Sequence, residues 1–149
     1  MAMRLTVQSD YSLRVLIFVA TKQGELSTIP EIASAYGISR AHLMKVVHQL
    51  GKLGYLETVR GRGGGFRLAQ SPSDICVGAV IKATEETLAL VPCLAHATAA
   101  GGCRIDGACR LKGMLSEGLN AFFAVLDRYT LADIVSGRAA PLRRLLQLA

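Results

Sequence analysis

The chain has 149 residues, a formal net charge of +6 and a sequence pI near 9.5, and 51% of its residues are hydrophobic. No apolar run approaches the roughly 20 residues that a membrane-spanning helix needs, and the apolar segment Leu13–Ala20 lacks the small-residue cleavage site of a secretory signal. These features argue against a membrane protein and a secreted one, so we expect a cytoplasmic protein of one domain, or of a small domain with an appendage.

The positive charge is concentrated in the first half of the chain. Residues 1–70 hold nine Lys and Arg against four Asp and Glu, whereas residues 71–149 hold eight against seven. A basic half joined to a nearly neutral half indicates that the first half contacts a polyanion and the second half has another role.

Three helices are predicted in the first half. Apolar residues recur at helical spacing in Ser9–Gly24, in Ser27–Ser39 and in Ser39–Leu56. Thr28 and Glu31 have the spacing of a capping box at the start of the second helix, and Ser39 is the expected N-cap of the third. Two short helices joined by a tight glycine turn predict a helix-turn-helix.

A β-hairpin is predicted directly after the third helix. Two short strand-like pieces, Leu56–Val59 and Phe66–Ala69, flank the sequence "RGRGGG". Glycine takes positive φ at little cost and therefore permits a sharp turn. A hairpin that follows a helix-turn-helix is a wing, so the fold class is expected to be mainly α with a small β-hairpin wing and a long dimerisation helix.

The second half is predicted to contain two helices with a cysteine-containing segment between them. A helix is expected over Asp74–Thr87, and one long helical element is expected from residue 111 to residue 135. We therefore divide the chain into a winged helix-turn-helix domain (1–70), a connecting helix (71–91), a cysteine segment (92–110), and a dimerisation helix with a C-terminal tail (111–149).

The residues expected to contact DNA lie at the start of the third helix and in the wing, since helix-turn-helix proteins insert that helix start into the major groove. Arginine on a slim wing suits the narrow minor groove, where the negative potential is concentrated. The expected contact residues are Thr28, Ser39, Arg40, His42, Lys45, His48, Arg60, Arg62, Gly63, Gly64 and Arg67.

Three of the four cysteines fall within seventeen residues, at Cys93, Cys103 and Cys109. Thiolates are soft ligands that suit zinc, copper(I) or iron–sulfur centres. A structural zinc site commonly uses short Cys-x-x-Cys steps and four ligands, and neither is present here. The spacing therefore favours an iron–sulfur cluster over zinc, with a fourth ligand from elsewhere.

Four residues are candidates for this fourth ligand: Cys76, His96, Asp106 and Asp10. Cys76 lies in an apolar helical stretch, where a buried, small hydrophobic role is expected. A thiol-dependent redox enzyme or electron carrier would need a Cys-x-x-Cys step or a cysteine beside a base. The chain shows neither, so we do not expect an enzyme.

In this order, these elements resemble the iron–sulfur winged-helix transcriptional regulators, a family that includes NsrR, the nitric-oxide-sensitive repressor, and its relatives IscR and RirA. The similarity covers nearly the whole chain, and the first and last segments look most like the NsrR group. Four segments carry it: "MRLTVQSDYSLRVLIFVA", "IPEIASAYGISRAHLMKVVHQL", "VRGRGGGFRLA" and "CRLKGMLSEGLNAFFAVLDRYTLADI".

The resemblance implies a homodimeric repressor that binds palindromic promoter DNA and responds to nitric oxide. It implies a 4Fe–4S cluster, or a 2Fe–2S cluster, held by Cys93, Cys103 and Cys109, with Asp10 of the opposite subunit as the fourth ligand. Nine residues separate Cys93 from Cys103, a longer spacing than is usual in the NsrR group. The histidine that IscR-like members use just beyond the third cysteine is replaced here by the sequence Arg110–Lys112. An iron or redox sensor of the same architecture and a zinc-stabilised DNA-binding protein remain the alternatives.

Overall fold

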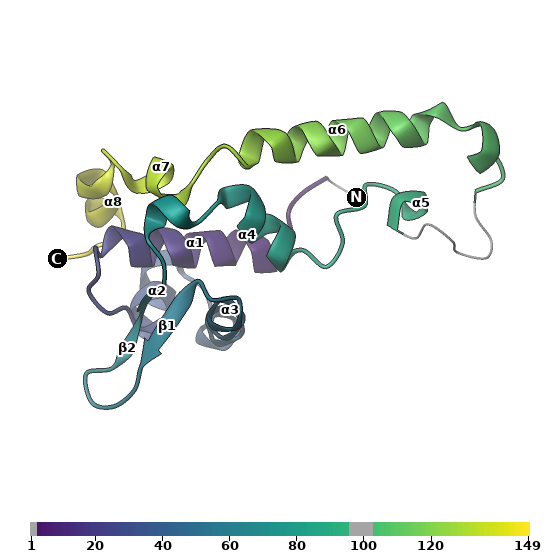
Figure 1. Cartoon of the computed structure of the whole chain (residues 1–149). Coiled ribbons are helices and arrows are strands. Elements are labelled where there is room, and N and C mark those ends of the chain that lie inside the picture. The colour runs from purple at the N-terminus through teal and green to yellow at the C-terminus, as the bar shows by residue number, and fades with distance from the viewer. Residues whose placement is uncertain (1–2, 96–102) are drawn as a thin grey trace.

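The computed structural model describes residues 3–95 and 103–149 (Figure 1). Helices dominate it, and its one described sheet is a two-stranded antiparallel hairpin. The helices and strands are α1 (Val7–Thr21), α2 (Ile29–Tyr36), α3 (Arg40–Lys52), β1 (Leu56–Val59), β2 (Gly65–Leu68), α4 (Val77–Thr84), α5 (Pro92–Ala95), α6 (Arg110–Leu126), α7 (Leu131–Val135) and α8 (Ala139–Leu145). Single 3₁₀ turns lie at Pro72–Asp74 and Asp106–Ala108. The prediction of a mainly α fold with a small β-hairpin wing is confirmed.

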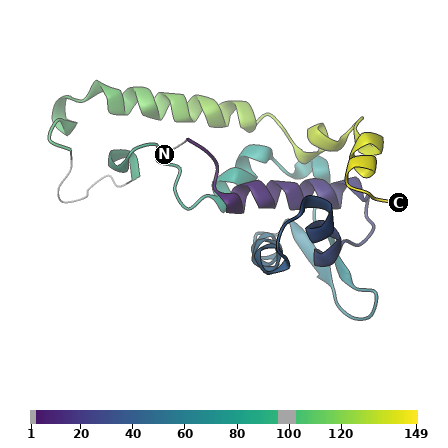
Figure 2. The same cartoon turned by 180° about the vertical axis from the view of Figure 1, so that it is seen from behind.

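Helix α1 lies at the centre of the core. Its residues Val15, Leu16 and Phe18 are fully buried, and the helix packs against α3, β2, α4, α7 and α8. Figures 1 and 2 show the helix-turn-helix and the hairpin on one side of α1, with α4 and α7 on the other. The helix that precedes the helix-turn-helix therefore also supports the second half of the chain.

The helix-turn-helix is formed by the capping residues and the glycine turn that the sequence predicts. The backbone N–H and the hydroxyl of Thr28 both donate to the Glu31 carboxylate, at 2.7 and 2.9 Å. Gly37 ends α2 with a left-handed φ of 67°, and the Ser39 hydroxyl accepts a hydrogen bond from the His42 N–H at the start of α3. Helix α3 ends at Lys52, earlier than the predicted Leu56.

The wing is attached to the helices by its own backbone. Strands β1 and β2 pair in a register that places Glu57 opposite Arg67. Beside this pairing, Ser27 and Phe66 exchange two backbone hydrogen bonds of 2.8 and 2.9 Å. The connection between α1 and α2 is therefore hydrogen-bonded to the wing.

The predicted helix over Asp74–Thr87 is shorter than expected. Ile75 and Cys76 are extended, and this segment is paired with residues 129–131: Val77 N–H donates to the Tyr129 carbonyl at 2.9 Å, and Leu131 N–H donates to the Ile75 carbonyl at 2.8 Å. This long-range pairing delays the start of α4 to Val77, although Ile75 itself is buried.

The same pairing makes the prediction of one helix over 111–135 wrong. Helix α6 ends at Leu126, the chain passes through the paired segment, and α7 starts with Thr130 and Asp133 as a new capping box. Helix α6, with 17 residues, extends away from α1 as an arm that carries α5 and the cysteine segment near its far end (Figure 1). In the described residues, no helix combines the length and the apolar character that crossing a membrane requires.

Candidate nucleic-acid interface and cysteine segment

The outward face of α3 carries the cations expected to contact DNA. Arg40, Lys45 and His48 are all exposed, whereas Leu43, Val46 and Leu50 on the opposite face are fully buried. His48 lies three positions from Lys45 and two turns of four residues from Arg40, so it joins the other two cations in one exposed surface. Residues 40, 45 and 48 are thus available to a ligand that approaches from solvent.

His42 is placed differently from these three residues. Its ring is half-buried and stacks edge-to-face on Tyr11 of α1, with ring centroids 4.8 Å apart. The side chains of Gln8 and Gln49 also form a hydrogen bond between α1 and α3. His42 is therefore a contact between the recognition helix and α1 as well as a candidate DNA contact.

The tip of the wing exposes Arg60 and Arg62. Within residues 3–95 and 103–149 neither arginine forms an ion pair with a carboxylate, and both are exposed. A Cβ atom on Gly64 would lie 2.3 Å from the Val59 carbonyl oxygen, and Gly63 has a φ of 71°. Only glycine fits both positions without strain, so the glycines give the tip its shape.

Arg67 and Thr28 have partners within the protein. The Arg67 Nε lies 2.5 Å from Glu57 Oε1, directly across the hairpin. Thr28 is half-buried and caps α2 through Glu31. Both residues stabilise the DNA-facing elements, which is a different contribution from contacting DNA.

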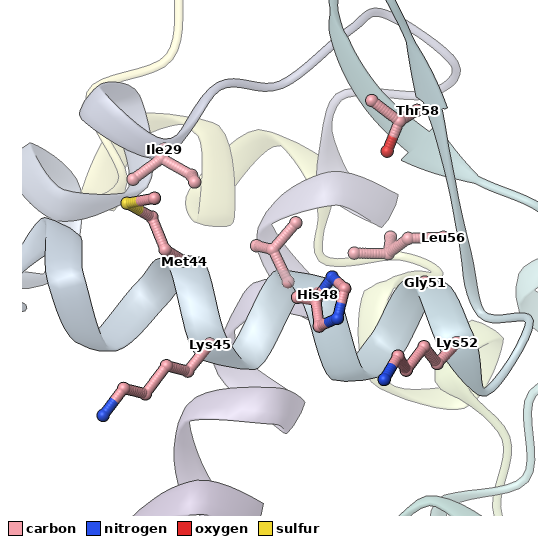
Figure 3. A pocket seen from close by; sticks show the side chains of 9 residues that line it. Ile29, Met44, Lys45, His48, Gly51, Lys52, Leu56 and Thr58 are labelled. Carbon is pink, nitrogen blue, oxygen red and sulfur yellow. The ribbon is translucent and has the colours of Figure 1, made fainter.

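An open groove with a volume of about 780 Å³ lies between α3 and β1 (Figure 3). We call it the α3–wing groove. Its lining residues are Ile29, Met44, Lys45, Val47, His48, Gly51, Lys52, Leu56 and Thr58. Lys45, His48 and Lys52 follow one another along α3, and all three are exposed. This row suits a phosphate backbone that passes along the helix. Neither Lys52 nor Met44 is among the contact residues that the sequence predicts.

The cysteine segment lies near the far end of α6. Cys109 directly precedes α6, and Cys93 lies in α5, which packs against α6. The carboxylate of Asp106, 3.0 Å from Lys112 Nζ, raises the pKa of Lys112, and the thiols of Cys93 and Cys109 act in the same direction. Cys109 and the helix α5 that contains Cys93 therefore lie at the same end of α6 as Lys112.

Cys103 is exposed, and its carbonyl accepts a hydrogen bond of 3.0 Å from the N–H of Asp106. All four cysteines are free. Three thiols on one segment have the donor chemistry of an iron–sulfur site. Nevertheless, among the residues that the structure describes, no three His, Cys, Asp or Glu side chains are arranged as a finished metal site. The donor set fits such a cluster, and within residues 3–95 and 103–149 the candidate ligands are not gathered at one point.

The four candidates for a further ligand have different surroundings. Asp10 Oδ1 accepts a hydrogen bond of 3.1 Å from Arg14 Nε, and this bond raises the pKa of Arg14. Asp106 is paired with Lys112, and His96 lies outside the described residues. Cys76 is half-exposed, which corrects the expectation of a buried thiol. Its Sγ lies 3.6 Å from the Asp127 carbonyl oxygen, at the opposite end of α6 from Cys109.

Comparisons with known proteins agree with this geometry. Residues 5–137 match the model of the Rrf2 family, described as an iron-dependent transcriptional regulator. The chain is 51% identical over 138 residues to the HTH-type transcriptional regulator NsrR of Bacillus subtilis, covering 91% of this chain and 92% of the relative. It is 50% identical to NsrR of Geobacillus kaustophilus, covering 97% of both chains. Among solved structures, IscR of T. potens aligns with a TM-score of 0.72 and 26% identity over 92% of this chain and 89% of that one.

Proposed function

Because the chain belongs to the Rrf2 family of transcriptional regulators, and its relatives are named as regulators and not as enzymes, we propose that it is a homodimeric repressor whose promoter binding responds to nitric oxide. It acts in the cytoplasm, where it meets promoter DNA. The observation that carries the DNA-binding part is the exposed row of cations on α3 beside the exposed arginines of the wing.

DNA binding uses the two parts of the winged domain in different ways. The start of α3, from Ser39 to Arg40, enters the major groove. Lys45 and His48 contact phosphates, because the α3–wing groove lies beside them. Arg60 and Arg62 enter the minor groove from a tip that Gly63 and Gly64 keep narrow.

Dimerisation uses the exposed face of α6. Leu111, Leu115, Phe122, Val125 and Tyr129 follow one another at steps that fit a seven-residue repeat of four and three. Leu111 is 58% exposed and Phe122 is 46% exposed. An apolar stripe of this length is covered when a second copy packs against it. Two copies then present two recognition helices to one palindromic site.

Cys93, Cys103 and Cys109 would hold the iron–sulfur cluster, and Asp10 of the partner subunit would complete it. When bound, the cluster supplies iron atoms that nitric oxide attacks. The arrangement of α1 explains how a contact at Asp10 affects DNA binding. Asp10 is paired with Arg14 in the isolated chain, and the next residue, Tyr11, stacks on His42 of α3. A change in the position of Asp10 therefore alters the support of the recognition helix.

A second candidate is an iron-availability sensor of the same architecture, which the description of the family as iron-dependent favours. In that case loss of iron is the signal. The residues that bind DNA and hold the cluster are the same in both candidates, so only the response to the signal separates them.

The test is an anaerobic purification of the full chain followed by an absorption spectrum and counts of iron and sulfide. The cluster-loaded protein should be brown and bind promoter DNA, and nitric oxide should weaken that binding at least tenfold. Iron chelation without nitric oxide is the comparison for the second candidate. Colourless, iron-free protein that still binds its promoter tightly contradicts the proposal, and a stoichiometric zinc content would indicate a zinc-stabilised regulator.

A further inference from the structure

The exposed face of α3 contains a long apolar side chain that the proposed function does not use. Within α3, which the structure describes completely, Met44 is the one exposed large hydrophobic residue, and 59% of its surface is accessible. Arg40 and His48 lie one turn before and after it on the same face. Met44 is therefore surrounded by residues that face DNA.

Packing within the chain does not account for Met44. In Figure 3 its thioether lies beside Ile29, at the edge of the α3–wing groove. That contact leaves more than half of the side chain exposed, whereas Leu43 next to it is fully buried. Single exposed apolar residues are common on protein surfaces. What distinguishes Met44 is that its exposed side chain lies between Arg40 and His48, which are proposed to contact DNA.

Met44 and its neighbour Lys45 point in different directions from α3. Figure 3 shows the Met44 side chain on the side of α3 that faces Ile29, with Lys45 directed to the other side of the helix. Neighbouring positions on α3 therefore differ in chemistry and direction. A cation suits a phosphate, but a thioether gains nothing from one.

The major groove offers a matching apolar group. The C5 methyl of thymine distinguishes that base from the other three, and apolar side chains recognise it by contact. Methionine is flexible and polarizable, which lets it adapt to such a contact. Resting on the proposed insertion of α3 into the major groove, we propose that Met44 is a specificity-determining residue that contacts the C5 methyl of one thymine in each half-site.

The size of the effect follows from the area that one methyl group buries. Removing one contacted methyl should weaken binding about fourfold. A symmetric dimer makes the contact twice, so removing both methyls of a palindromic site should weaken binding about 15-fold.

The experiment uses the anaerobically purified full chain and a duplex enriched from a random library by binding to that chain. Each symmetric pair of thymines in the enriched site is replaced with deoxyuridine, which lacks only the methyl group. One pair should weaken wild-type binding about 15-fold. In Met44→Ala the same replacement should change affinity less than about twofold, and Met44→Leu should retain the preference for thymine. Lys45→Ala is the matched control, because it should weaken binding to both duplexes equally.

Two results would overturn the inference. The first is wild-type binding that is insensitive to deoxyuridine at every thymine, or an enriched site without thymine. The second is a Met44→Ala variant with the same deoxyuridine penalty as the wild type. A library that yields no enriched sequence would instead contradict the proposed function itself, so the two failures are distinguishable.

Discussion

Tyr11 in α1 and His42 in α3 stack edge-to-face with their ring centroids 4.8 Å apart. This contact joins the residue next to Asp10 to the first turn of the recognition helix. The winged domain thus contains a direct side-chain connection between the α1 residue proposed to complete the cluster and the helix proposed to read DNA.

We expect Tyr11→Leu to weaken promoter binding by the cluster-loaded protein about twofold to tenfold, since an aromatic pair contributes about 0.5–1.5 kcal/mol beyond its buried area. Tyr11→Phe keeps the ring and should bind as the wild type does. Band shifts with and without nitric oxide would measure both variants. Equal affinities for Tyr11→Leu and the wild type in the cluster-loaded state would show that the stack has no role in DNA binding.

The tip of the wing should tolerate no side chain at Gly64. A Cβ atom there would lie 2.3 Å from the Val59 carbonyl oxygen and 2.8 Å from that of Gly61. Gly64→Ala should therefore cost about 1–3 kcal/mol in the free energy of unfolding and should weaken DNA binding. Gly113→Ala in α6, where the Cβ meets open space, is the control and should be neutral or stabilising in urea unfolding. A fully stable, DNA-binding Gly64→Ala protein would refute the argument.

Substitutions of different cysteines should have different effects on the iron content of the purified protein. Cys103→Ser should lose most of its iron and its visible absorption after anaerobic purification, because one thiolate ligand is removed. Cys76→Ser should retain both, since Cys76 lies beside Asp127 at the other end of α6. The prediction fails if the two variants carry the same amount of iron.

A charge in the apolar stripe of α6 should separate the dimer. Phe122→Glu would bury a carboxylate in the proposed interface, so the variant should sediment as a monomer and lose at least tenfold in promoter affinity. Asn120→Glu adds the same charge away from the stripe and should remain dimeric. Analytical ultracentrifugation measures both, and a dimeric Phe122→Glu protein would place the interface elsewhere.

Stability should fall at high pH because of Tyr36. Burial raises the pKa of Tyr36 to about 12, with Arg14 opposing and Asp10 supporting this shift. The folded state binds the phenolic proton more tightly than the unfolded state, so this contribution is complete below pH 10 and is lost as the pH rises from about 10 to about 12. Urea unfolding across this range should show a smaller decline for Tyr36→Phe. That variant should also be about 0.5–1.5 kcal/mol less stable at pH 8, because it lacks the hydroxyl that donates to the Arg14 carbonyl at 3.1 Å. An identical decline in both proteins would assign the pH dependence to other groups.

Local signals in the sequence predicted the winged domain well. Strand β1 has the predicted bounds, Leu56–Val59, and Ser39 caps α3 as expected. Caps, turns and periodicity are properties of neighbouring residues, which makes them visible in one sequence. The pairing of residues 75–77 with residues 129–131 joins segments more than fifty positions apart. No local pattern encodes that pairing, and the late start of α4 and the break between α6 and α7 follow from it.

The candidate site was predicted less completely, for a different reason. The contact residues predicted from the sequence were polar residues and glycines, so the exposed apolar side chain of Met44 was not among them. The pairing of Arg67 with Glu57 depends on the hairpin register, which the sequence does not determine. The Asp10–Arg14 pair was not predicted, although it has the four-residue spacing of a common helical ion pair.

Among the described residues, helix α6 packs against α4 near its C-terminal end and against the short helix α5. Near Asp127 it is fixed to α4, where Lys82 Nζ lies 2.7 Å from Asp127 Oδ2 and 4.9 Å from the centre of the Phe123 ring. Its other end, about 25 Å away for a helix of this length, carries the cysteine segment. If the thiol-bearing end of α6 moves by an ångström or two, the helix rotates slightly about its contact with α4. Helix α4 in turn packs against α1. A movement at the thiol-bearing end of α6 would therefore reach α1 through folded elements alone, without unfolding any part of them.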